Sequence, residues 1–402
     1  MRCLRFFRSA SALFLSATAL AAQPSLHRVP APPGLHPLPI SAGGRMLTTP
    51  ASAPSFGGLD YTSQWPGSYF RADFHGTRVY FRIVAGDQIL RIIADGRAIA
   101  SLTKPTAGVY ELEGLSPCRH QITILVATES QAAPNTFGGF AIPAGEKELT
   151  RPPRHRQIEF IGDSHTVGYG NLSTSHSCTR DQVWADTDDT KAFGALIAAH
   201  YDADYQINAI SGRGVVRNYD GFQADTLPEA YPYVLFDKKQ QYSDPAWTPQ
   251  VIVIALGTND FSTPLHAGER WKNRDELHAD YEATYLRFLE DLRARDPHAL
   301  LIVWATDMAQ GEIESEAQKV VQQMKRRGDQ RIVFLPVDGL SFRACEWHPS
   351  RADDRTIAGK LIHLIDAERP WVTGRRAQRR VCVTDSPMSR PSSPAPRRGS
   401  SR

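Results

Sequence analysis

The hydrophobic pattern of this chain changes period near Arg156, and this change limits the fold more than any other feature of the sequence. Before it, short segments such as 69–74 and 78–84 alternate polar and apolar side chains, and Gly/Asp turns separate them. Such strands, spaced roughly ten residues apart, predict a β-sandwich of the jelly-roll kind. After Arg156 the strand-like runs alternate with amphipathic helical segments, which predicts a parallel sheet with helices on both faces.

The second half is therefore expected to form a three-layer α/β/α domain. The predicted strands are 158–161, 205–210, 251–256, 300–305 and 332–336, and the predicted helices are 190–200, 274–295, 313–327 and 354–367. Catalytic groups in such folds lie on loops at the carboxyl ends of the strands. The loops that follow these strands are accordingly the places where a functional site is expected.

Three other segments lack the pattern of a folded domain. Near the N-terminus, arginines precede an apolar stretch that ends in Ala-Leu-Ala, which predicts a secretory signal peptide cut after Ala21. The next segment is rich in Pro, Ala, Ser and Gly, as linkers are, and the C-terminal segment of Arg, Ser and Pro is too polar to build a core. The expected organisation is a signal peptide at 1–21, a linker at 22–56, a β-sandwich domain at 57–152, an α/β domain at 153–373 and a disordered tail at 374–402.

The charge pattern argues against a nucleic acid as partner. The formal net charge is +3, but arginines crowd both ends of the chain, so the part between them is mildly acidic. A chain of this kind offers no basic face to a nucleic acid. Outside the N-terminal stretch there is no apolar run of the roughly 18 residues that a membrane span needs. We therefore expect a secreted or periplasmic protein that does not reside in a membrane.

A serine stands in a glycine-rich turn directly after the first predicted strand of the second half. Residues 161–171 read IGDSHTVGYGN, in which Ser164 follows Gly162 and precedes Gly168 and Gly170. Glycine permits positive φ and close backbone approach, and such turns leave N–H groups free to face an anion. A strand that delivers a serine into this kind of turn is typical of a hydrolase nucleophile, which also needs a base and an oxyanion hole.

Three later loops carry residues that can complete this chemistry. The loop after the second strand contains Gly212, the loop after the third contains Asn259, and His348 stands in a loop before the last helix. An imidazole titrates near neutral pH, so His348 is the best candidate for the base. The N–H groups of Ser164 and Gly212 and the side-chain amide of Asn259 would give an oxyanion three donors.

The order of these blocks resembles that of the SGNH, or GDSL-type, hydrolases. The blocks are Gly-Asp-Ser at 162–164, Gly212, Gly-Thr-Asn-Asp at 257–260 and His-Pro at 348–349. The surrounding sequence is more similar still to carbohydrate esterase family 2, the two-domain acetyl esterases. This is seen in WPGSYF at 65–70, RQIEFIGDS at 156–164 and SGRGVVRNY at 211–219, and the resemblance spans residues 57–370.

The resemblance implies an N-terminal β-sandwich, a C-terminal SGNH hydrolase domain, and an esterase that removes acetyl groups from polysaccharides such as xylan and glucomannan. The roles it implies are nucleophile for Ser164, general base and then acid for His348, and oxyanion hole for Ser164, Gly212 and Asn259. The SGNH pattern at large has an aspartate three residues before the histidine, but that residue is Cys345 here. Members of carbohydrate esterase family 2 use a Ser-His dyad in which a backbone carbonyl holds the imidazole, so the resemblance implies such a dyad here, with the Glu346 carboxylate as the alternative.

Aromatic side chains are a common way to hold carbohydrate. Tyr219 and Trp304 are candidates for aromatic walls against a sugar ring. The implied chemistry needs no metal or organic cofactor, and the implied partner is an acetylated polysaccharide or oligosaccharide bound by a monomer. Two alternatives stay open: a carbohydrate-binding protein without turnover, and an SGNH esterase that acts on lipid, thioester or peptidoglycan O-acetyl substrates.

Two cysteines stand near the candidate catalytic residues. Cys178 follows Ser164 by fourteen residues, and Cys345 precedes His348 by three. If the serine and the histidine meet, these cysteines approach each other as well, and an oxidising compartment would favour a Cys178–Cys345 disulfide. Free buried thiols are the alternative.

Overall fold

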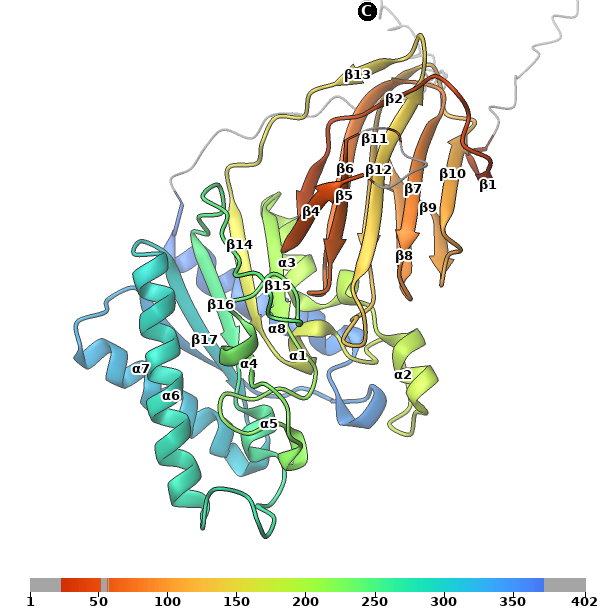
Figure 1. Cartoon of the computed structure of the whole chain (residues 1–402). Helices are drawn as coiled ribbons and strands as arrows, with labels where there is room; N and C mark the ends of the chain where they lie inside the picture. Colours follow the sequence, from red (N-terminus) through yellow and green to blue (C-terminus); the bar gives the residue numbers. More distant parts are fainter. Residues whose placement is uncertain (1–22, 52–55, 57, 372–402) are drawn as a thin grey trace, which may run out of the picture.

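The structure is a computed structural model, and it describes residues 23–51, 56 and 58–371. The predicted signal peptide at 1–21 and the predicted tail at 374–402 lie outside the described residues. The described chain forms an antiparallel β-sandwich and an α/β domain that lie side by side (Figure 1). The expected fold class is confirmed.

The first sheet of the sandwich runs in the order β1-β10-β7-β12-β5-β4, and β2 pairs with β12. Its strands are β1 (Ser25–Val29), β2 (Leu35–Pro37), β4 (Met46–Pro50), β5 (Leu59–Ser63), β7 (Val79–Ala85), β10 (Gly108–Glu113) and β12 (Asn135–Pro143). Every pairing among them is antiparallel.

The second sheet runs in the order β13-β6-β11-β8-β9, and β3 pairs with β6. Its strands are β3 (Ser41–Gly43), β6 (Tyr69–Gly76), β8 (Ile89–Ala94), β9 (Arg97–Thr103), β11 (Cys118–Val126) and β13 (Lys147–Leu149). Side chains from both sheets share one apolar core, in which the rings of Phe70 and Phe137 stack with their centroids 4.2 Å apart. The alternating pattern of the sequence is thus explained by inward-facing residues on two packed sheets.

The predicted linker at 22–56 is wrong, because its described residues supply β1 to β4 to the two sheets. The sandwich therefore begins about thirty residues earlier than position 57. Prolines such as Pro30, Pro32 and Pro33 lie between strands rather than inside them, where a missing N–H costs no ladder bond. β1 and β4 are edge strands and half exposed, so their sequences show little of the hydrophobic alternation by which a strand is recognised.

The α/β domain is built on a five-stranded parallel sheet in the order β15-β14-β16-β17-β18. The strands are β14 (Gln157–Gly162), β15 (Asp204–Ala209), β16 (Val251–Ala255), β17 (Leu300–Thr306) and β18 (Ile332–Val337). The α-helices are α1 (Ser164–Val167), α2 (Arg180–Asp186), α3 (Phe193–Tyr201), α4 (Leu227–Ala230), α5 (Thr258–Phe261), α6 (Arg274–Arg295), α7 (Glu312–Arg326) and α8 (Arg351–Glu368). All five predicted strands and all four predicted helices are present.

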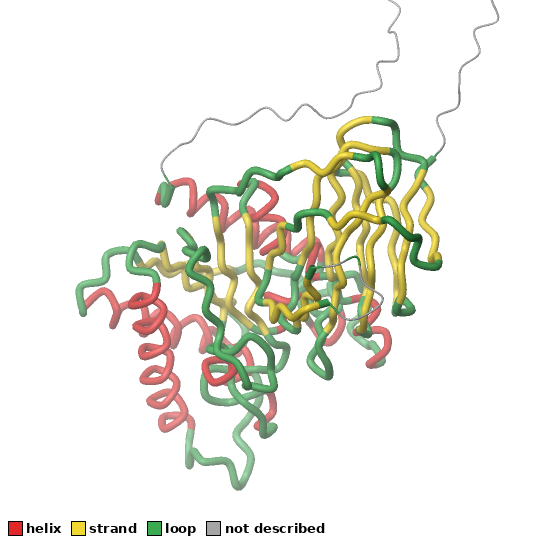
Figure 2. The backbone as a smooth tube through the Cα atoms, turned by 45° about the horizontal axis from the view of Figure 1, so that its top comes forward, coloured by secondary structure: helices red, strands yellow, loops and turns green. Residues whose placement is uncertain are grey.

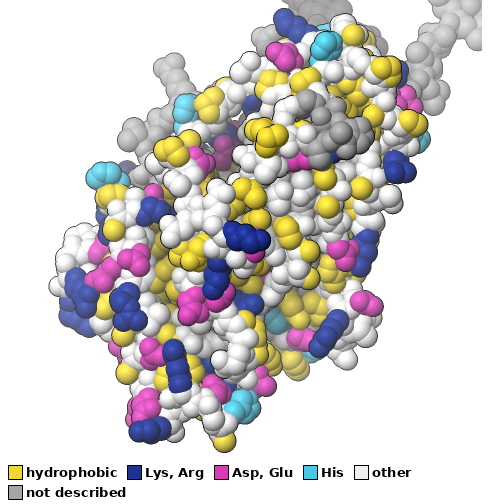
Figure 3. Space-filling model, in the orientation of Figure 1, with side chains coloured by type: hydrophobic (Ala, Val, Ile, Leu, Met, Phe, Trp, Pro, Cys, Tyr) yellow, Lys and Arg dark blue, Asp and Glu magenta, His cyan; other side chains and the backbone are white. Residues whose placement is uncertain are grey.

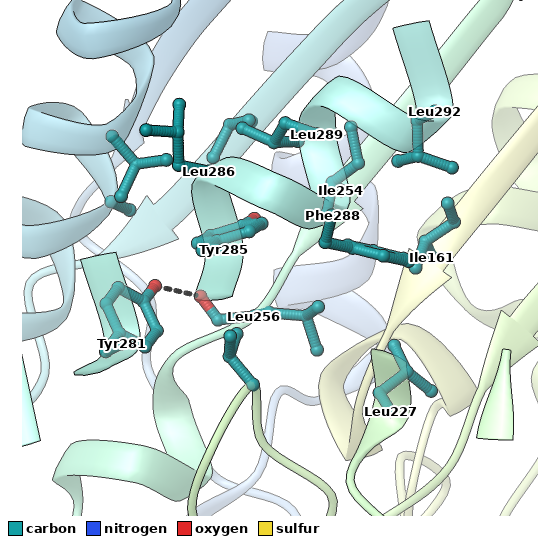
Figure 4. Close-up of a cluster of buried hydrophobic side chains, with 14 of the residues drawn as sticks. Ile161, Leu227, Ile254, Leu256, Tyr281, Tyr285, Leu286, Phe288, Leu289 and Leu292 are labelled. Atoms are coloured by element: carbon teal, nitrogen blue, oxygen red, sulfur yellow. Dashed lines mark hydrogen bonds between the residues drawn. The ribbon is translucent and has the colours of Figure 1, made fainter. Parts of the chain in front are cut away.

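Each face of this sheet carries its own core. Helices α6 and α7 cover one face, and α3 and α8 cover the other, while the sandwich is built of strands and loops (Figures 1 and 2). Figure 4 shows the first core, where α6 lays Tyr281, Tyr285 and Leu289 against strand residues such as Ile254. The Tyr281 hydroxyl donates to the Leu256 carbonyl at 3.0 Å, so the polar tip of this buried ring is satisfied where β16 ends.

The surface shows no segregation of charge on the face drawn in Figure 3, where Lys and Arg side chains are interspersed with Asp and Glu. Within the described ranges, none of the helices combines the length and apolar character that a membrane crossing requires.

A buried ion network joins the two domains. The Arg45 side chain, between β3 and β4 of the sandwich, is 1% exposed and lies 3.4 Å from the Glu159 carboxylate on β14. Arg295, the last residue of α6, bonds the other carboxylate oxygen of Glu159. Asn208 and Tyr231 donate to the same carboxylate. Burial opposes ionisation of this carboxyl, but Arg295 and Arg45 outweigh it and lower the pKa of Glu159.

We expect Glu159→Ala to lower the free energy of unfolding by about 3 kcal/mol, because it leaves the buried Arg45 guanidinium without a counter-charge. Urea denaturation measures this loss. The control is Glu113→Ala, whose partner His27 is exposed; it should change the free energy of unfolding by less than about 0.5 kcal/mol. Equal losses for the two variants would contradict the stabilising role of the network.

Candidate active site

The serine lies at the start of a short helix that follows β14 directly. Asp163 caps α1, because its Oδ1 accepts a hydrogen bond from the His165 N–H at 3.1 Å. Gly168 ends the helix in the left-handed region, at φ 76°, which a glycine adopts without steric cost. Ser164 is thereby held near the carboxyl end of β14 with 5% of its surface exposed.

The serine and the histidine meet, although 184 residues separate them. The Ser164 Oγ lies 2.9 Å from the His348 Nε2. On the other side of the ring, Nδ1 lies 3.0 Å from the Cys345 carbonyl oxygen and 3.1 Å from the Glu346 carbonyl oxygen. Carbonyl oxygens only accept hydrogen bonds, so Nδ1 carries the proton and Nε2 is left to accept the proton of the serine hydroxyl.

The surroundings of His348 favour its neutral form. Burial lowers the pKa of His348 below its usual value of 6.5. The backbone carbonyls of Cys345 and Glu346 raise it, but they do not outweigh the burial. At neutral pH the imidazole is therefore free to take up a proton.

The Glu346 carboxylate does not orient the histidine. It accepts a hydrogen bond from the Tyr169 hydroxyl at 3.0 Å, while the Tyr169 ring lies against the His348 ring with the centroids 4.4 Å apart. Only the backbone carbonyl of Glu346 faces Nδ1. The carboxylate alternative from the sequence is therefore not realised in this geometry.

The loop that carries His348 is held in an unusual backbone conformation. Glu346 and Trp347 both have positive φ, 52° and 59°, which costs a non-glycine residue about 1–2 kcal/mol. Three contacts with the segment around Cys178 hold the loop in place. A disulfide joins Cys178 to Cys345, the Glu346 N–H donates to the His176 carbonyl at 2.8 Å, and the Trp347 and His176 rings stack 3.6 Å apart.

The Gly212 turn follows β15 at the same edge of the sheet. Gly212 has φ 82°, and its carbonyl accepts a hydrogen bond from the Tyr219 N–H at 2.9 Å. The buried Asp260 carboxylate on α5 holds the next part of this loop by accepting from the N–H groups of residues 215, 216 and 217. Among the described residues, neither the Gly212 N–H nor the Ser164 N–H has a hydrogen-bond partner.

Asn259 lies on α5, directly after Gly257, whose φ of 125° turns the chain at the end of β16. Its side-chain Nδ2 is 2.9 Å from the Arg213 carbonyl and 3.2 Å from the Asp163 Oδ2. Both hydrogens of this amide are therefore engaged within the site. The sequence placed Asn259 near the other donors, but it gave no indication of these bonds.

Aromatic side chains lie exposed around Ser164 and His348. Tyr219 is 52% exposed, Phe222 42% and Trp347 61%. Phe222 lies against Gly212, where an added Cβ would approach its ring within 3.2 Å, and Trp347 precedes His348. Of these three residues, only Tyr219 was predicted from the sequence. The adjacency of Phe222 and Trp347 to the motif residues was the feature that would have indicated them.

Trp304 is not part of this surface, and its prediction as an aromatic wall is wrong. It lies on β17, is 1% exposed, and packs edge-on against Phe193 of α3 with the ring centroids 5.3 Å apart. The sheet is covered on both faces, so a side chain in the middle of β17 meets a helix whichever way it points. The large side chain of Trp304 fills the core between the sheet and α3.

The site offers no arrangement that would hold a metal. In the part of the chain that the structure describes, no three His, Cys, Asp or Glu side chains gather in a way suited to a metal ion.

Both domains match known families. Residues 43–153 match the family described as carbohydrate esterase 2 N-terminal, and residues 160–367 match the GDSL-like lipase/acylhydrolase family. The chain is 43% identical over 338 residues to an acetylxylan esterase / glucomannan deacetylase of Cellvibrio japonicus (strain Ueda107), a match that covers 83% of this chain and 93% of the relative.

Solved structures show the same arrangement. One is a carbohydrate esterase whose active site is described as having divergent catalytic and non-catalytic binding functions; it has a TM-score of 0.79 and 41% identity, and covers 84% of this chain and 100% of its own. Another is a family two carbohydrate esterase from Clostridium thermocellum in complex with cellohexaose, with a TM-score of 0.71, 27% identity, and coverage of 83% of this chain and 100% of its own. The chain thus belongs to carbohydrate esterase family 2, and it is a carboxylic ester hydrolase.

Proposed function

We propose that this protein removes acetyl groups from polysaccharides such as xylan or glucomannan, and that a Ser164-His348 dyad does the chemistry. The observation that carries the proposal is the 2.9 Å contact between Ser164 Oγ and His348 Nε2, made by an imidazole whose Nδ1 faces only backbone carbonyls. The activity for which the Cellvibrio relative is named, acetylxylan esterase / glucomannan deacetylase, supports the choice of substrate.

The reaction follows from the positions of these atoms. Ser164 Oγ attacks the acetyl carbonyl carbon while His348 Nε2 takes the hydroxyl proton, and a tetrahedral oxyanion forms. The C–O bond to the sugar then breaks, and the imidazolium returns the proton to the departing sugar oxygen. Water, deprotonated by the same imidazole, next attacks the acetyl-serine. The bond between Ser164 Oγ and the acetyl carbon then breaks, the imidazolium returns the proton to Ser164 Oγ, and acetate leaves.

In a dyad the backbone must orient the histidine, a task that a carboxylate performs in a triad. In a triad a carboxylate fixes the histidine tautomer and stabilises the imidazolium. In the proposed dyad, the carbonyls of residues 345 and 346 fix the same tautomer. Their partial charges stabilise the imidazolium less than a full negative charge would, so the geometry of the loop has to be kept accurately.

The oxyanion is bound by the free N–H groups of Ser164 and Gly212 in this proposal. Asn259 can add a third donor only if its amide exchanges one of its present acceptors for the oxyanion. The exchange with the Asp163 Oδ2 is favoured, since that bond is the longer one, at 3.2 Å against 2.9 Å for Arg213. Such donors act most strongly in low-dielectric surroundings, and Ser164 is buried.

The exposed rings of Tyr219, Phe222 and Trp347 suit a sugar chain as substrate. Each offers an apolar face with no charge, and the apolar face of a pyranose ring can lie against it. The surface beside the serine therefore fits a carbohydrate better than an acyl chain, which would call for a deeper apolar channel.

We expect the wild-type protein to release acetate from acetylated xylan and glucomannan, and Ser164→Ala to lose at least about 10³-fold in rate, because it removes the attacking oxygen. Acetate is quantified enzymatically, and the same substrates in soluble form are used for binding by calorimetry. Retained binding with no turnover by the wild type would contradict the proposal and identify a carbohydrate-binding protein. Faster release from acetylated peptidoglycan would overturn the assigned substrate class.

The pH dependence of kcat/KM should follow the protonation of His348. His348 acts as a base only when neutral, and burial lowers its pKa below 6.5. The acid limb of kcat/KM for 4-nitrophenyl acetate should therefore have its midpoint below pH 6.5, with a plateau through neutral pH. An NMR titration of the His348 ring in Ser164→Ala should give a matching midpoint. A limb centred above pH 6.5 would contradict the assigned base.

We also propose that the chain is exported, which the signal-like residues before Ala22 and the Cys178–Cys345 disulfide support. N-terminal sequencing of the protein from a secreting bacterial host should find a chain that starts at Ala22. As the control, a version that lacks 2–21 should stay in the cytoplasm. Full-length protein in the cytoplasm, starting at Met1, would contradict export.

A further inference from the structure

One loop of the β-sandwich reaches the turn that carries Gly212. The loop joins β11 to β12, and its Glu129 Oε1 accepts a hydrogen bond from the Ser211 N–H at 2.7 Å. The side-chain amide of Gln131, in the same loop, donates to the Ser211 carbonyl at 3.1 Å and to Glu129 Oε1 at 3.0 Å. Both backbone polar groups of Ser211 are thus bound by residues of the other domain.

The bond from Gln131 acts on the peptide unit that matters for catalysis. The carbonyl of Ser211 and the N–H of Gly212 belong to the same peptide group, which is planar and trans, so the two point in opposite directions. Fixing the carbonyl toward Gln131 therefore fixes the N–H of Gly212 toward the other side, away from the sandwich. A donor to the carbonyl also polarises the peptide and strengthens its N–H as a donor.

We propose that Glu129 and Gln131 of the β-sandwich are positioning residues, which orient the Ser211–Gly212 peptide so that the Gly212 N–H can stabilise the oxyanion. The inference rests on the proposed function. It makes the β-sandwich part of the catalytic apparatus, although neither residue touches the reacting atoms.

The loop is itself fixed, as a positioning role requires. The Gln64 side chain donates to the Gln131 carbonyl at 3.1 Å and accepts from the Phe236 N–H of the α/β domain at 3.0 Å. Asn135, the first residue of β12, bonds the Ser130 hydroxyl. Residues on both sides of the interface therefore hold the loop where Glu129 and Gln131 can reach Ser211.

The bond between Glu129 and the Ser211 N–H does not depend on whether the carboxyl group is ionised. Burial raises its pKa, and the bonds from Ser211 and Gln131, together with the charge of Arg213, lower it in part. A carboxyl group here accepts the Ser211 N–H through Oε1 in either protonation state, because the second oxygen can carry the proton.

The test compares kcat and KM for 4-nitrophenyl acetate in Gln131→Ala, Glu129→Ala and the conservative Glu129→Gln. Without the Gln131 amide on the Ser211 carbonyl, the Ser211–Gly212 peptide can rotate. Gln131→Ala should therefore lower kcat by about 10-fold and change KM by less than about twofold. This loss is smaller than the roughly 10²–10³-fold loss in rate that follows when an oxyanion-hole donor itself is removed. Glu129→Ala should behave alike. Glu129→Gln keeps an oxygen acceptor for the Ser211 N–H and should restore most of kcat.

A transition-state analogue separates positioning from stability. Methylboronic acid forms a tetrahedral adduct on a catalytic serine, and its affinity should fall in Gln131→Ala by the same factor as kcat/KM. Thermal denaturation shows whether the variant is folded. The matched control is Arg71→Ala, which removes another contact between the domains, the 2.8 Å ion pair with Asp204. Asp204 begins β15, at the strand end away from the site, so kcat should stay at the wild-type value.

Unchanged kcat and unchanged boronate affinity in Gln131→Ala and Glu129→Ala, with an active wild type and an inactive Ser164→Ala, would overturn this inference and leave the proposed function standing. An equal loss in Arg71→Ala would also overturn it, because the effect would then belong to domain contact in general. Full turnover by Ser164→Ala would instead overturn the proposed function itself.

Discussion

The structure of this site depends on how a backbone turn aims two carbonyl oxygens at one ring nitrogen. His348 has no carboxylate behind it, and the side chain that could have supplied one, Glu346, is bonded to Tyr169 instead. The orientation of the His348 imidazole is therefore set by the φ values of Glu346 and Trp347, both in the left-handed region. A conformation that costs free energy at two successive residues persists only if its surroundings hold it, and here the disulfide, a backbone hydrogen bond and a ring stack do so.

Both domains contribute residues to the site, at the same edge of the parallel sheet, but the α/β domain contributes more of them. The α/β domain supplies the serine, the histidine and the glycine turn from the carboxyl ends of its strands, where parallel folds place their chemistry. The sandwich contacts the backbone of that glycine turn through Ser211 and contributes Arg45 to the buried charge cluster around Glu159. A buried arginine with its partners on another domain limits how far the domains can shift, so the contact at Ser211 is kept in register.

The sequence allowed the parallel sheet and the loops of Ser164, Gly212, Asn259 and His348 to be predicted, because period and turn residues are local properties. It did not reveal β1 to β4, since half-exposed edge strands carry little alternation. It also placed Trp304 at the surface, because in a strand buried on both faces no period tells a core ring from a binding ring. The hydrogen bonds of Asn259 and the approach of Gln131 to Ser211 arise from contacts distant in sequence, which no local pattern records.

The positions of the two disulfide cysteines along the chain determine when the site can form during synthesis. Cys178 and Cys345 are 167 residues apart, and β15 to β18 lie between them in the chain. During synthesis the serine turn and Cys178 emerge early, while the residues that aim the imidazole emerge only after the last strand of the sheet. The bridge that holds them can close only after Cys345 has been made, and the folded sheet between the two cysteines brings them together. Ser164 and His348, the proposed nucleophile and base, can therefore meet only after β15 to β18 have been made, so a partly made chain carries the serine without its histidine.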